Sequence, residues 1–371
     1  MNLSTAARRR GLIALLATSF LMYGGFFMVI PLVSVYFVEH LGLAAFMVGL
    51  ALAMRQLIQQ GMTLFGGALA DRFGVRLLIG AGVLIRAVGF FSLAQASEPV
   101  GLFTAMLLSG LGGSLFDAPS RAAMAALTTE ETRARFFSLN AIASNLGMVV
   151  GPLVGALLIR YNFATVCFVA GACFMLIVIV VLLLPRVRVV EVPQRISFGL
   201  GLALRDRTFV TFTAILMGYW FMWVQLTLSL PLVGERLTGS SDTVGLIYAF
   251  NAGLTVLLQY PTLRLAERWL RPMPILVIGV ALMALGLGCV AAATSLPTLL
   301  LCVGIFTIGT LLSSPTQQTV AAALADPRAL GSYFGVNALA LAFGGSLGNM
   351  SGGLLTDLAR AIGVPALPWL M

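Results

Sequence analysis

The sequence predicts an all-α fold: a polytopic helical membrane protein made of two pseudo-symmetric six-helix halves, here with the twelfth helix missing. Three observations carry this prediction. Of the 371 residues, 60% are apolar and only 9% are charged, and the mean hydropathy is +1.02. Apolar runs long enough to span a bilayer recur along the chain. Short motifs of the first half reappear in the second half at a nearly constant distance.

The composition excludes a water-soluble domain. About a quarter of the residues of such a domain are normally charged. A globule of this size also exposes a large share of its residues, so it could not hide this much apolar surface from water. The medium around most of the chain is therefore lipid.

Spanning helices need roughly 20 apolar residues each. The first run follows Arg8, Arg9 and Arg10; it is too long for a signal peptide, and no small-residue cleavage site follows it. Eleven runs qualify as spanning helices: 12–38, 43–66, 77–96, 100–126, 136–159, 163–185, 209–232, 244–263, 273–294, 297–324 and 332–358.

All 22 basic residues are arginines, and their distribution predicts the orientation. With a cytoplasmic N-terminus, Arg160, Arg236 and Arg360 lie outside. Sixteen arginines then lie on the cytoplasmic side: 8, 9, 10, 72, 76, 133, 135, 186, 188, 195, 205, 207, 264, 268, 271 and 328. Because these arginines alternate loop by loop and form no continuous stripe, they do not predict a nucleic-acid partner.

An internal repeat predicts two parallel halves. Pro31–Val33 recurs as Pro231–Val233, and Leu69–Arg72 recurs in part as Leu265–Arg268, with offsets between 196 and 200 residues across five helices. Related halves of six helices are a known transporter plan. We therefore expect a first half at 1–185, a cytoplasmic linker at 186–208, and a second half at 209–371.

The second half has five predicted helices, and the chain stops where a twelfth would begin. With eleven spans, the C-terminus would lie outside. We expect either a shortened natural form or a gene sequence that ends early.

The loop between the second and third helices carries the first motif, Gly67–Arg76. Gly74 permits a tight turn between two helices, and Asp71 can cap a helix end or pair with a cation. The residues of this motif with a predicted role are Gly67, Asp71, Arg72, Gly74 and Arg76.

The fifth helix carries the second motif, Gly147, Gly151, Pro152 and Gly155. Glycines four residues apart free one helix face for close packing, and the proline bends the helix.

Together these two motifs resemble the major facilitator superfamily, in particular its drug/proton antiporters. A resemblance to a group of multidrug resistance proteins within it is carried by Arg55–Gly61, Leu108–Gly113, Leu115–Pro119, Arg135–Ser138 and Leu367–Trp369. The resemblance runs from Arg10 to the last residue. It implies that the loop latches the two halves in the outward-facing state. Val75 replaces a usual basic residue of the loop, so we expect either that Arg76 takes over its pairing or that the latch is weaker. Met106 stands where the superfamily has an arginine, so no proton-relay role is carried over to that position.

Charges inside the membrane are costly, so each is a candidate for function. Arg55 shares a helix face with Gln59, and Arg86 lies at similar depth; neither helix contains an acidic partner. These two arginines fit either a structural polar seam or a role in substrate binding or coupling.

Asp117 and Arg121 have the i,i+4 spacing of an ion pair. In the family, an acidic residue at this place joins the loop Gly67–Arg76, called the signature loop below, in a charge relay.

Aromatic side chains supply candidates for the cavity wall. Tyr23 with Phe27, and Tyr219 with Trp223, are spaced i,i+4 on the first and seventh helices, which line the central path in facilitator transporters. Further polar candidates in the second half are Asn251 and Gln318. Such residues are as often packing as binding residues. Two buried arginines without a matching acid favour anionic or zwitterionic substrates over simple cations.

Three functions compete. The resemblance favours a secondary active transporter that exports small amphipathic compounds by proton antiport through alternating access. The alternatives are a major facilitator importer or uniporter of a small anionic or zwitterionic solute, and a non-transporting membrane sensor or scaffold. An enzyme is not expected, because no nucleophile, base or metal cluster appears. The four cysteines have no metal-ligand spacing.

We therefore expect no metal and no cofactor beyond the proton gradient. The expected partners are the lipid bilayer, a small-molecule substrate and protons, but no nucleic acid. The protein is expected to be a monomer that lies in the bacterial inner (cytoplasmic) membrane as a multi-pass protein.

Overall fold

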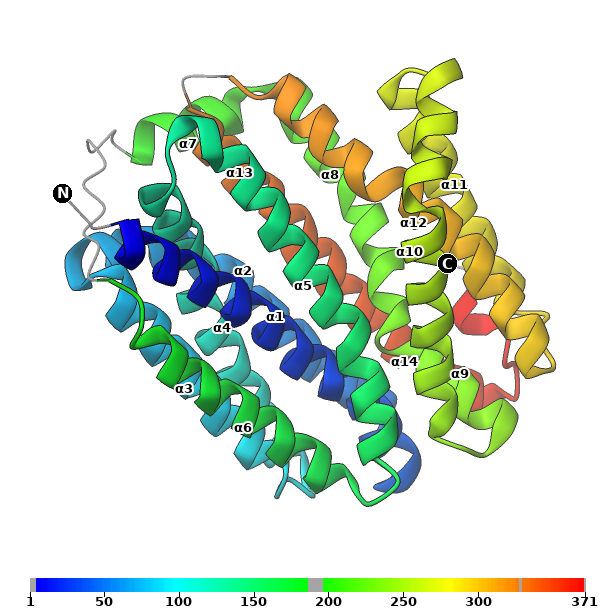
Figure 1. Ribbon diagram of the computed structural model, residues 1–371. Coiled ribbons are helices and arrows are strands. Elements are labelled where there is room, and N and C mark those ends of the chain that lie inside the picture. The colour runs from blue at the N-terminus through cyan, green and yellow to red at the C-terminus, as the bar shows by residue number, and fades with distance from the viewer. Residues whose placement is uncertain (1–4, 186–195, 327–328, 370–371) are drawn as a thin grey trace. The chain divides into compact units, whose positions relative to one another are not determined.

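The computed structural model describes residues 5–185, 196–326 and 329–369, and within these ranges it consists of helices and turns with no strand (Figure 1). Side chains are described in these ranges except at 5–6, 64–68, 70–72, 130–131, 133–134, 196–198 and 330–331. The predicted all-α fold is confirmed.

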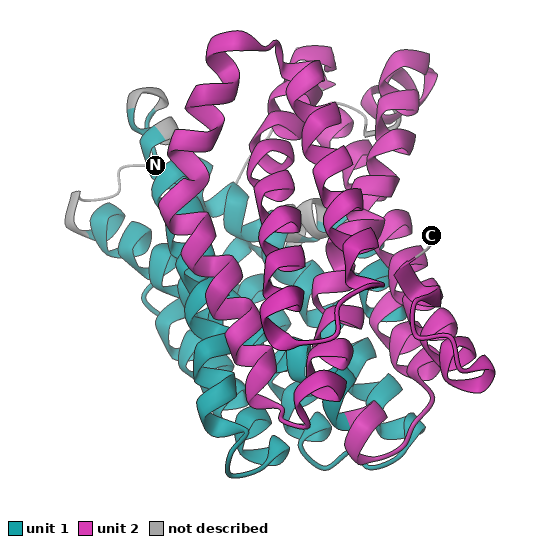
Figure 2. Ribbon diagram, turned by 90° about the vertical axis from the view of Figure 1, so that its right-hand side faces the viewer, with its two compact units in different colours: residues 1–36, 54–192 teal, residues 37–53, 193–371 magenta. Residues whose placement is uncertain are grey.

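The residues group into two compact units (Figure 2). Unit 1 comprises residues 1–36 and 54–192, and unit 2 comprises 37–53 and 193–371. The units follow the predicted halves except for segment 37–53, which packs with unit 2. Two hydrogen bonds account for part of this: the backbone N–H groups of Ala45 and Phe46 both donate to the Asp357 carboxylate.

The described residues of unit 1 form six helices, the second of which enters the unit at Met54. Helix α1 packs against α5 and α6, and α3 packs against α4 and α6. Their interior is apolar, with the rings of Phe90 and Phe174 in contact at a centroid distance of 5.0 Å. The helices are α1 (Thr5–Val35), α2 (Ala45–Phe73), α3 (Val75–Leu93), α4 (Pro99–Leu127), α5 (Glu130–Leu158) and α6 (Phe163–Val181).

Local sequence explains where several of these helices begin. Pro99 starts α4, where its missing N–H costs nothing. The Thr129 and Thr132 side chains form a capping box at α5, and Asn162 accepts from the Thr165 backbone N–H over 2.7 Å at α6. Short loops therefore suffice between these helices.

Unit 2 begins with part of a π-helical turn, η1 (Tyr36–His40), and the first residues of α2. Its remaining elements are α7 (Ile196–Arg205), α8 (Arg207–Trp223), η2 (Val224–Leu226), α9 (Ser229–Thr238), α10 (Asp242–Trp269), α11 (Pro272–Val290), α12 (Leu296–Leu324), α13 (Leu330–Leu339), η4 (Ala340–Gly345), α14 (Ser346–Ile362) and η5 (Leu367–Trp369).

Two predicted helices are interrupted. The predicted span 209–232 is divided into α8, η2 and α9, because Pro231 in the first turn of α9 has no N–H to donate to the carbonyl of Thr227. The predicted span 332–358 contains the π-helical stretch η4, where Gly344 packs closely on the backbone of Met217.

The predicted linker 186–208 is only partly a linker. Residues 186–195 lie outside the described residues, but α7 occupies Ile196–Arg205 and α8 begins at Arg207. The Asp206 side chain between them caps α8 by accepting from the Phe209 N–H over 3.1 Å. The same carboxylate accepts from the Tyr333 hydroxyl over 3.1 Å.

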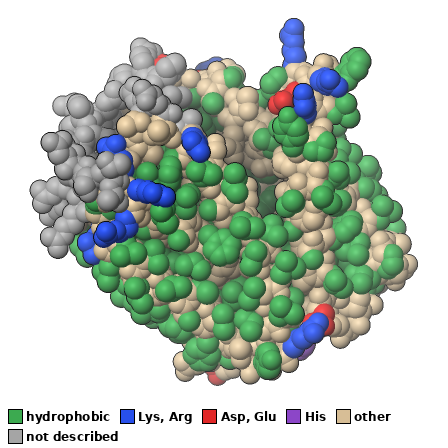
Figure 3. Space-filling model, in the orientation of Figure 1, with side chains coloured by type: hydrophobic (Ala, Val, Ile, Leu, Met, Phe, Trp, Pro, Cys, Tyr) green, Lys and Arg blue, Asp and Glu red, His purple; other side chains and the backbone are tan. Residues whose placement is uncertain are grey.

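Among the described residues, ten helices or helical runs are long and apolar enough to cross a membrane, against the eleven predicted. The remaining prediction, 43–66, corresponds to α2, which is 29 residues long and carries Arg55, Gln56 and Gln59. Apolar side chains cover most of the described part of the face shown in Figure 3, and basic side chains lie toward its margins. This distribution is that of a protein solvated by lipid.

The repeat is visible in the packing of glycines inside each unit. In unit 1, a Cβ on Gly82 or Gly112 would collide with the carbonyl oxygen of the other, which holds α3 against α4. In unit 2, Gly279 and Gly309 have the same relationship on α11 and α12. Both pairs differ by 197 residues (279 − 82 and 309 − 112). The halves therefore repeat their helix contacts as well as their motifs.

Candidate functional site

A chain of polar side chains joins α2 to α4 inside unit 1. The Arg55 guanidinium donates from Nη1 to Gln59 Oε1 over 2.8 Å and from Nη2 to Gln56 Oε1 over 2.7 Å. Gln59 donates from Nε2 to Asp117 Oδ2 over 3.2 Å. Arg55 and Gln56 are buried, whereas Asp117 is partly exposed. A buried cation is thus linked to a carboxylate through one amide.

Arg86 on α3 lies beside this chain without a comparable partner. Its guanidinium carbon lies 4.5 Å from the centroid of the Phe26 ring and 5.6 Å from that of Phe174. The Arg55 guanidinium also lies over Phe26, at 4.8 Å. The buried Nε atoms of Arg55 and Arg86 have no hydrogen-bond partner among the described residues. The rings of Phe26 and Phe174 therefore offer cation–π attraction to the charge of Arg86.

Glycines of α4 bring these side chains together. A Cβ on Gly110 would lie 2.8 Å from the carbonyl oxygen of Arg55, and one on Gly113 would lie 2.7 Å from the Gln59 amide carbon. A Cβ on Gly112 would lie 2.7 Å from the Cβ of Arg86. Small residues are what allow polar side chains of three helices to meet at this depth.

The signature loop is described only in part. Gly74 has φ +84°, the left-handed conformation that favours glycine, and is the N-cap of α3. Val75 is buried, and Arg76 is half-buried. The side chains of Asp71 and Arg72 lie outside the described residues, as do the surroundings of Gly67, so the predicted latch remains a prediction.

The expected ion pair between Asp117 and Arg121 is not among the ion pairs of the described residues. Asp117 points its Oδ2 to Gln59 instead, and Arg121 is exposed. The i,i+4 spacing made the ion pair possible, but the amide of Gln59 on the neighbouring helix takes one carboxylate oxygen.

The glycine motif of α5 faces α1. A Cβ on Gly147, Gly151 or Gly155 would collide with a backbone carbonyl oxygen of α1, and these oxygens belong to Phe20, Gly24 and Met28 respectively. Pro152 lies inside α5 next to the middle glycine. The motif therefore forms a seam along which the two helix backbones are in direct contact.

The same seam exists in unit 2. Cβ atoms on Gly344, Gly348 and Gly352 would meet Met217, Phe221 and Gln225. Each of these six residues lies 197 positions after its counterpart in unit 1 (for example 344 − 147 and 217 − 20). Gln225 adds a hydrogen bond to this seam, from Nε2 to the Gly348 carbonyl over 3.0 Å.

The predicted aromatic candidates differ in exposure. Phe27 and Tyr219 are buried, which makes them core residues of their units. Tyr23 and Trp223 are partly exposed. Trp223 packs edge-on against Trp220 at a centroid distance of 5.6 Å. Tyr23 and Trp223 therefore stay the better candidates for a cavity wall.

The polar candidates of unit 2, Asn251 and Gln318, differ in their contacts and exposure. Asn251 donates from Nδ2 to the Thr307 hydroxyl over 2.8 Å, which joins α10 to α12. Gln318 is exposed. Asn251 is thus already engaged in packing between two helices.

Sequence reasoning missed a cluster of charges in unit 2. Glu39 Oε1 pairs with Arg236 Nε at 3.1 Å and with Arg360 Nη2. Beside it, His40 Nε2 lies 3.9 Å from the buried Glu235. These residues are far apart in sequence and follow no periodic pattern, so the only available signal was that each lies at a helix end.

The remaining titratable side chains and thiols do not gather into a common metal site within the described part of the chain. No group of three His, Cys, Asp or Glu side chains there could hold a metal ion. The cysteines at 167, 173, 289 and 302 are free thiols within apolar helices.

Comparison with known proteins supports a single assignment. The family model of the Major Facilitator Superfamily matches residues 15–359. The chain is 43% identical to the multidrug resistance protein MdtH of Yersinia enterocolitica, over 100% of this chain and 93% of that protein. It has the same identity and coverage with MdtH of Yersinia pestis (strain Pestoides F).

Solved structures share its fold. The nucleoside transporter NupG (D323A mutant) superposes with a TM-score of 0.84 at 15% identity, over 97% of this chain and 95% of that one. A POT family transporter in complex with 5-aminolevulinic acid gives a TM-score of 0.80 at 16% identity, over 97% and 92%. The protein is thus a multi-pass membrane transporter and not an enzyme, and it belongs to the Major Facilitator Superfamily.

Proposed function

We propose that this protein exports small amphipathic compounds in exchange for protons. The observation that carries the proposal is its 43% identity, along the whole chain, to proteins named for multidrug resistance. The glycine seam between α1 and α5 supports it, because the resemblance to drug/proton antiporters rests on the residues that form this seam. In cells, the membrane that fits such a role is the bacterial inner membrane, with the N-terminus cytoplasmic.

Asp117 is our candidate for the residue that couples protons to movement. Its carboxylate is partly exposed and is linked through Gln59 to the buried cation of Arg55. Protonation would remove the negative charge that faces Gln59 and weaken this link between α2 and α4. A change in packing between two helices could then follow from a change in proton occupancy.

Segment 37–53 is our candidate for a moving contact. It belongs to the first half of the repeat, yet Glu39 and Asp357 hold it within unit 2. Alternating access is largely a rocking of one half against the other. We infer that these carboxylate contacts break and reform during each cycle.

Each unit has its own candidate for contact with a flat substrate, namely the partly exposed ring of Tyr23 in unit 1 and that of Trp223 in unit 2. A second candidate function is uptake or facilitated diffusion of a small anionic or zwitterionic solute. The observation that favours it is the pair of buried guanidinium groups, Arg55 and Arg86, with one carboxylate nearby.

Dye efflux from cells that carry or lack the gene tests the main proposal. Efflux should depend on the protein and should stop when a protonophore collapses the proton gradient. Protein-dependent efflux that a protonophore leaves unchanged would reject proton antiport. Uptake of anions without efflux of dyes would favour the second candidate.

A further inference from the structure

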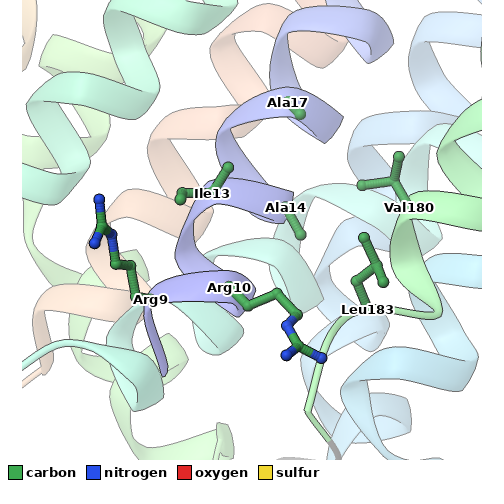
Figure 4. Close-up of a pocket in the computed structure, with 7 residues that line it drawn as sticks. All are labelled: Arg9, Arg10, Ile13, Ala14, Ala17, Val180 and Leu183. Carbon is green, nitrogen blue, oxygen red and sulfur yellow. The ribbon is translucent and has the colours of Figure 1, made fainter. Parts of the chain in front are cut away.

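A groove lies between the N-terminal part of α1 and the C-terminal end of α6 in unit 1 (Figure 4). It encloses about 480 Å³. The small side chains of Ala14 and Ala17 line it from α1, with Val180 and Leu183 opposite and Arg9 and Arg10 at its end.

Helix packing explains why the groove exists. At Gly11, a Cβ would lie 2.8 Å from Cδ of Pro185 and 2.9 Å from Leu127, so α1 is held close to the chain that follows α6. One turn further along α1, Ala14 and Ala17 are too short to fill the space beside Val180. The space is therefore built into the sequence of α1.

Among the residues that the structure describes, the lining of the groove is basic and includes no acidic side chain. Arg9 and Arg10 are both exposed, and neither forms an ion pair with another described residue. Neither α1 nor α6 contains an aspartate or glutamate. Two positive charges thus stand at the end of an apolar groove without a counter-ion from either helix.

The surroundings of the groove are lipid-facing. Ile13 is 56% exposed, and Ile179, Leu182 and Leu183 are between 52% and 62% exposed. Apolar side chains this exposed on a membrane protein contact hydrocarbon. A small water-soluble anion would satisfy the arginines but would leave the apolar floor unfilled.

We propose that this groove is a binding site for an anionic phospholipid. Its phosphate would lie against the Arg10 guanidinium, which points toward Leu183 in Figure 4 and suits phosphate oxygens. Arg9 points to the other side of α1 and adds a second positive charge at this end of the groove. One acyl chain would lie over Ala14 and Ala17, against Val180 and Leu183. Basic pockets between membrane helices bind anionic head groups elsewhere for the same reason. The site is independent of the transported substrate and of proton coupling.

Native mass spectrometry of the purified, delipidated full chain tests this site. Phosphatidylglycerol and phosphatidylcholine with the same acyl chains are added in turn. The parent should retain phosphatidylglycerol at concentrations where phosphatidylcholine is lost. The double variant Arg9→Gln/Arg10→Gln should bind phosphatidylglycerol about tenfold more weakly, since each arginine near the surface contributes to anionic lipid attraction.

A matched control is Arg268→Gln/Arg271→Gln, which removes the same charge from two exposed arginines of unit 2. This control should bind phosphatidylglycerol within about twofold of the parent, because its arginines do not line the groove and the attraction of anionic lipid to arginines is local. Equal losses in the two double variants would overturn the proposal, because the effect would then be one of net charge. Unchanged binding in Arg9→Gln/Arg10→Gln would overturn it as well.

Ala17→Leu fills the groove and keeps both arginines, so it should also weaken phosphatidylglycerol binding. Circular dichroism and thermal unfolding like those of the parent would show that the variant folds. Undiminished binding in a folded Ala17→Leu protein would overturn the proposed position of the acyl chain. Excess glycerol phosphate should leave the lipid bound; displacement by it would instead identify a site for a free phosphate ester.

Discussion

Gln59 on α2 donates a hydrogen bond to Asp117 on α4 over 3.2 Å, and this amide is the connection between the carboxylate and the buried guanidinium of Arg55. The contact joins two helices of unit 1. An amide can bridge unlike charges because it accepts at its oxygen and donates at its nitrogen. We therefore expect a change in the charge of Asp117 to alter the environment of Arg55.

Replacing Asp117 by asparagine should uncouple transport from the proton gradient. The side chain keeps its size and can still accept from Gln59, but it can no longer bind and release a proton. We expect gradient-driven transport to fall by about tenfold or more, a loss in the range seen when a proton-transfer group is removed. Transport of labelled substrate in proteoliposomes, with and without an imposed pH gradient, measures this.

Glu98→Gln is the control for Asp117→Asn. Glu98 precedes the same helix, is exposed, and makes no capping hydrogen bond. Its replacement should leave gradient-driven transport unchanged. If Asp117→Asn were as strongly coupled to the gradient as the parent, Asp117 would not be the coupling residue.

Replacing Arg86 by methionine tests whether this residue serves the stability of the fold or transport. Arg86 is buried, and its Nε has no hydrogen-bond partner among the described residues. A poorly compensated buried charge stabilises little, and an apolar residue of similar length is often neutral or stabilising there. We expect the unfolding temperature to hold or rise while transport falls.

The outcomes for Arg86→Met are distinct. Lower stability with a proportional loss of transport would make Arg86 a structural residue. Normal transport in a stable variant would remove it from the substrate and coupling candidates. Arg86→Lys keeps the charge but loses the planar group that lies over Phe26, so it tests the aromatic contact separately.

The α1–α5 seam should be intolerant of a single methyl group. In Gly151→Ala, the new Cβ would collide with the Gly24 carbonyl oxygen, which is backbone and cannot move aside cheaply. Overpacking of this kind typically costs about 1–3 kcal/mol. A reduced unfolding temperature in detergent and reduced transport are expected.

Gly61→Ala provides the comparison, because a Cβ at Gly61 on α2 meets nothing within 4 Å. Alanine also has the higher helix propensity. This variant should be at least as stable as the parent. Equal losses of stability in both variants would show that the seam has no special role.

Asp357 should protect two backbone N–H groups at the start of α2. Both Ala45 and Phe46 donate to its carboxylate, at 2.9 and 2.8 Å. Loss of a helix cap costs about 1 kcal/mol. Hydrogen–deuterium exchange at these two amides should therefore accelerate in Asp357→Ala.

Asp206→Ala gives the reciprocal control. Asp206 caps α8 through the N–H of Phe209. Its loss should expose that amide and leave Ala45 and Phe46 protected. Unaltered exchange at Ala45 and Phe46 in Asp357→Ala would mean that other contacts hold segment 37–53 in unit 2.

Much of the fold follows from the sequence because bilayer thickness sets the length of each apolar run. The repeat was likewise readable, and the matching seams at Gly147 and Gly344 show that it extends to backbone contacts. The pattern of apolar residues did not predict where helices are interrupted. The break before Pro231 and the π-helical stretch at Gly344 depend on local backbone geometry, which leaves the apolar pattern unchanged.

The polar candidates were found because a charge within an apolar run stands out, as Arg55, Arg86 and Asp117 do. Their partners were not predictable to the same degree. The i,i+4 spacing predicted Arg121 as the partner of Asp117, whereas the packing of α4 against α2 makes Gln59 its hydrogen-bond partner. Contacts such as Asp357 with Ala45 join residues 312 apart, and no local pattern marks them.

Transport by the purified protein in sealed proteoliposomes tests the central claim most directly. With a proton gradient imposed in either direction, a labelled amphipathic drug should move against the proton flow, and a protonophore should abolish its accumulation. Accumulation of the drug in the absence of any proton gradient, or movement of drug and protons in the same direction, would contradict the account.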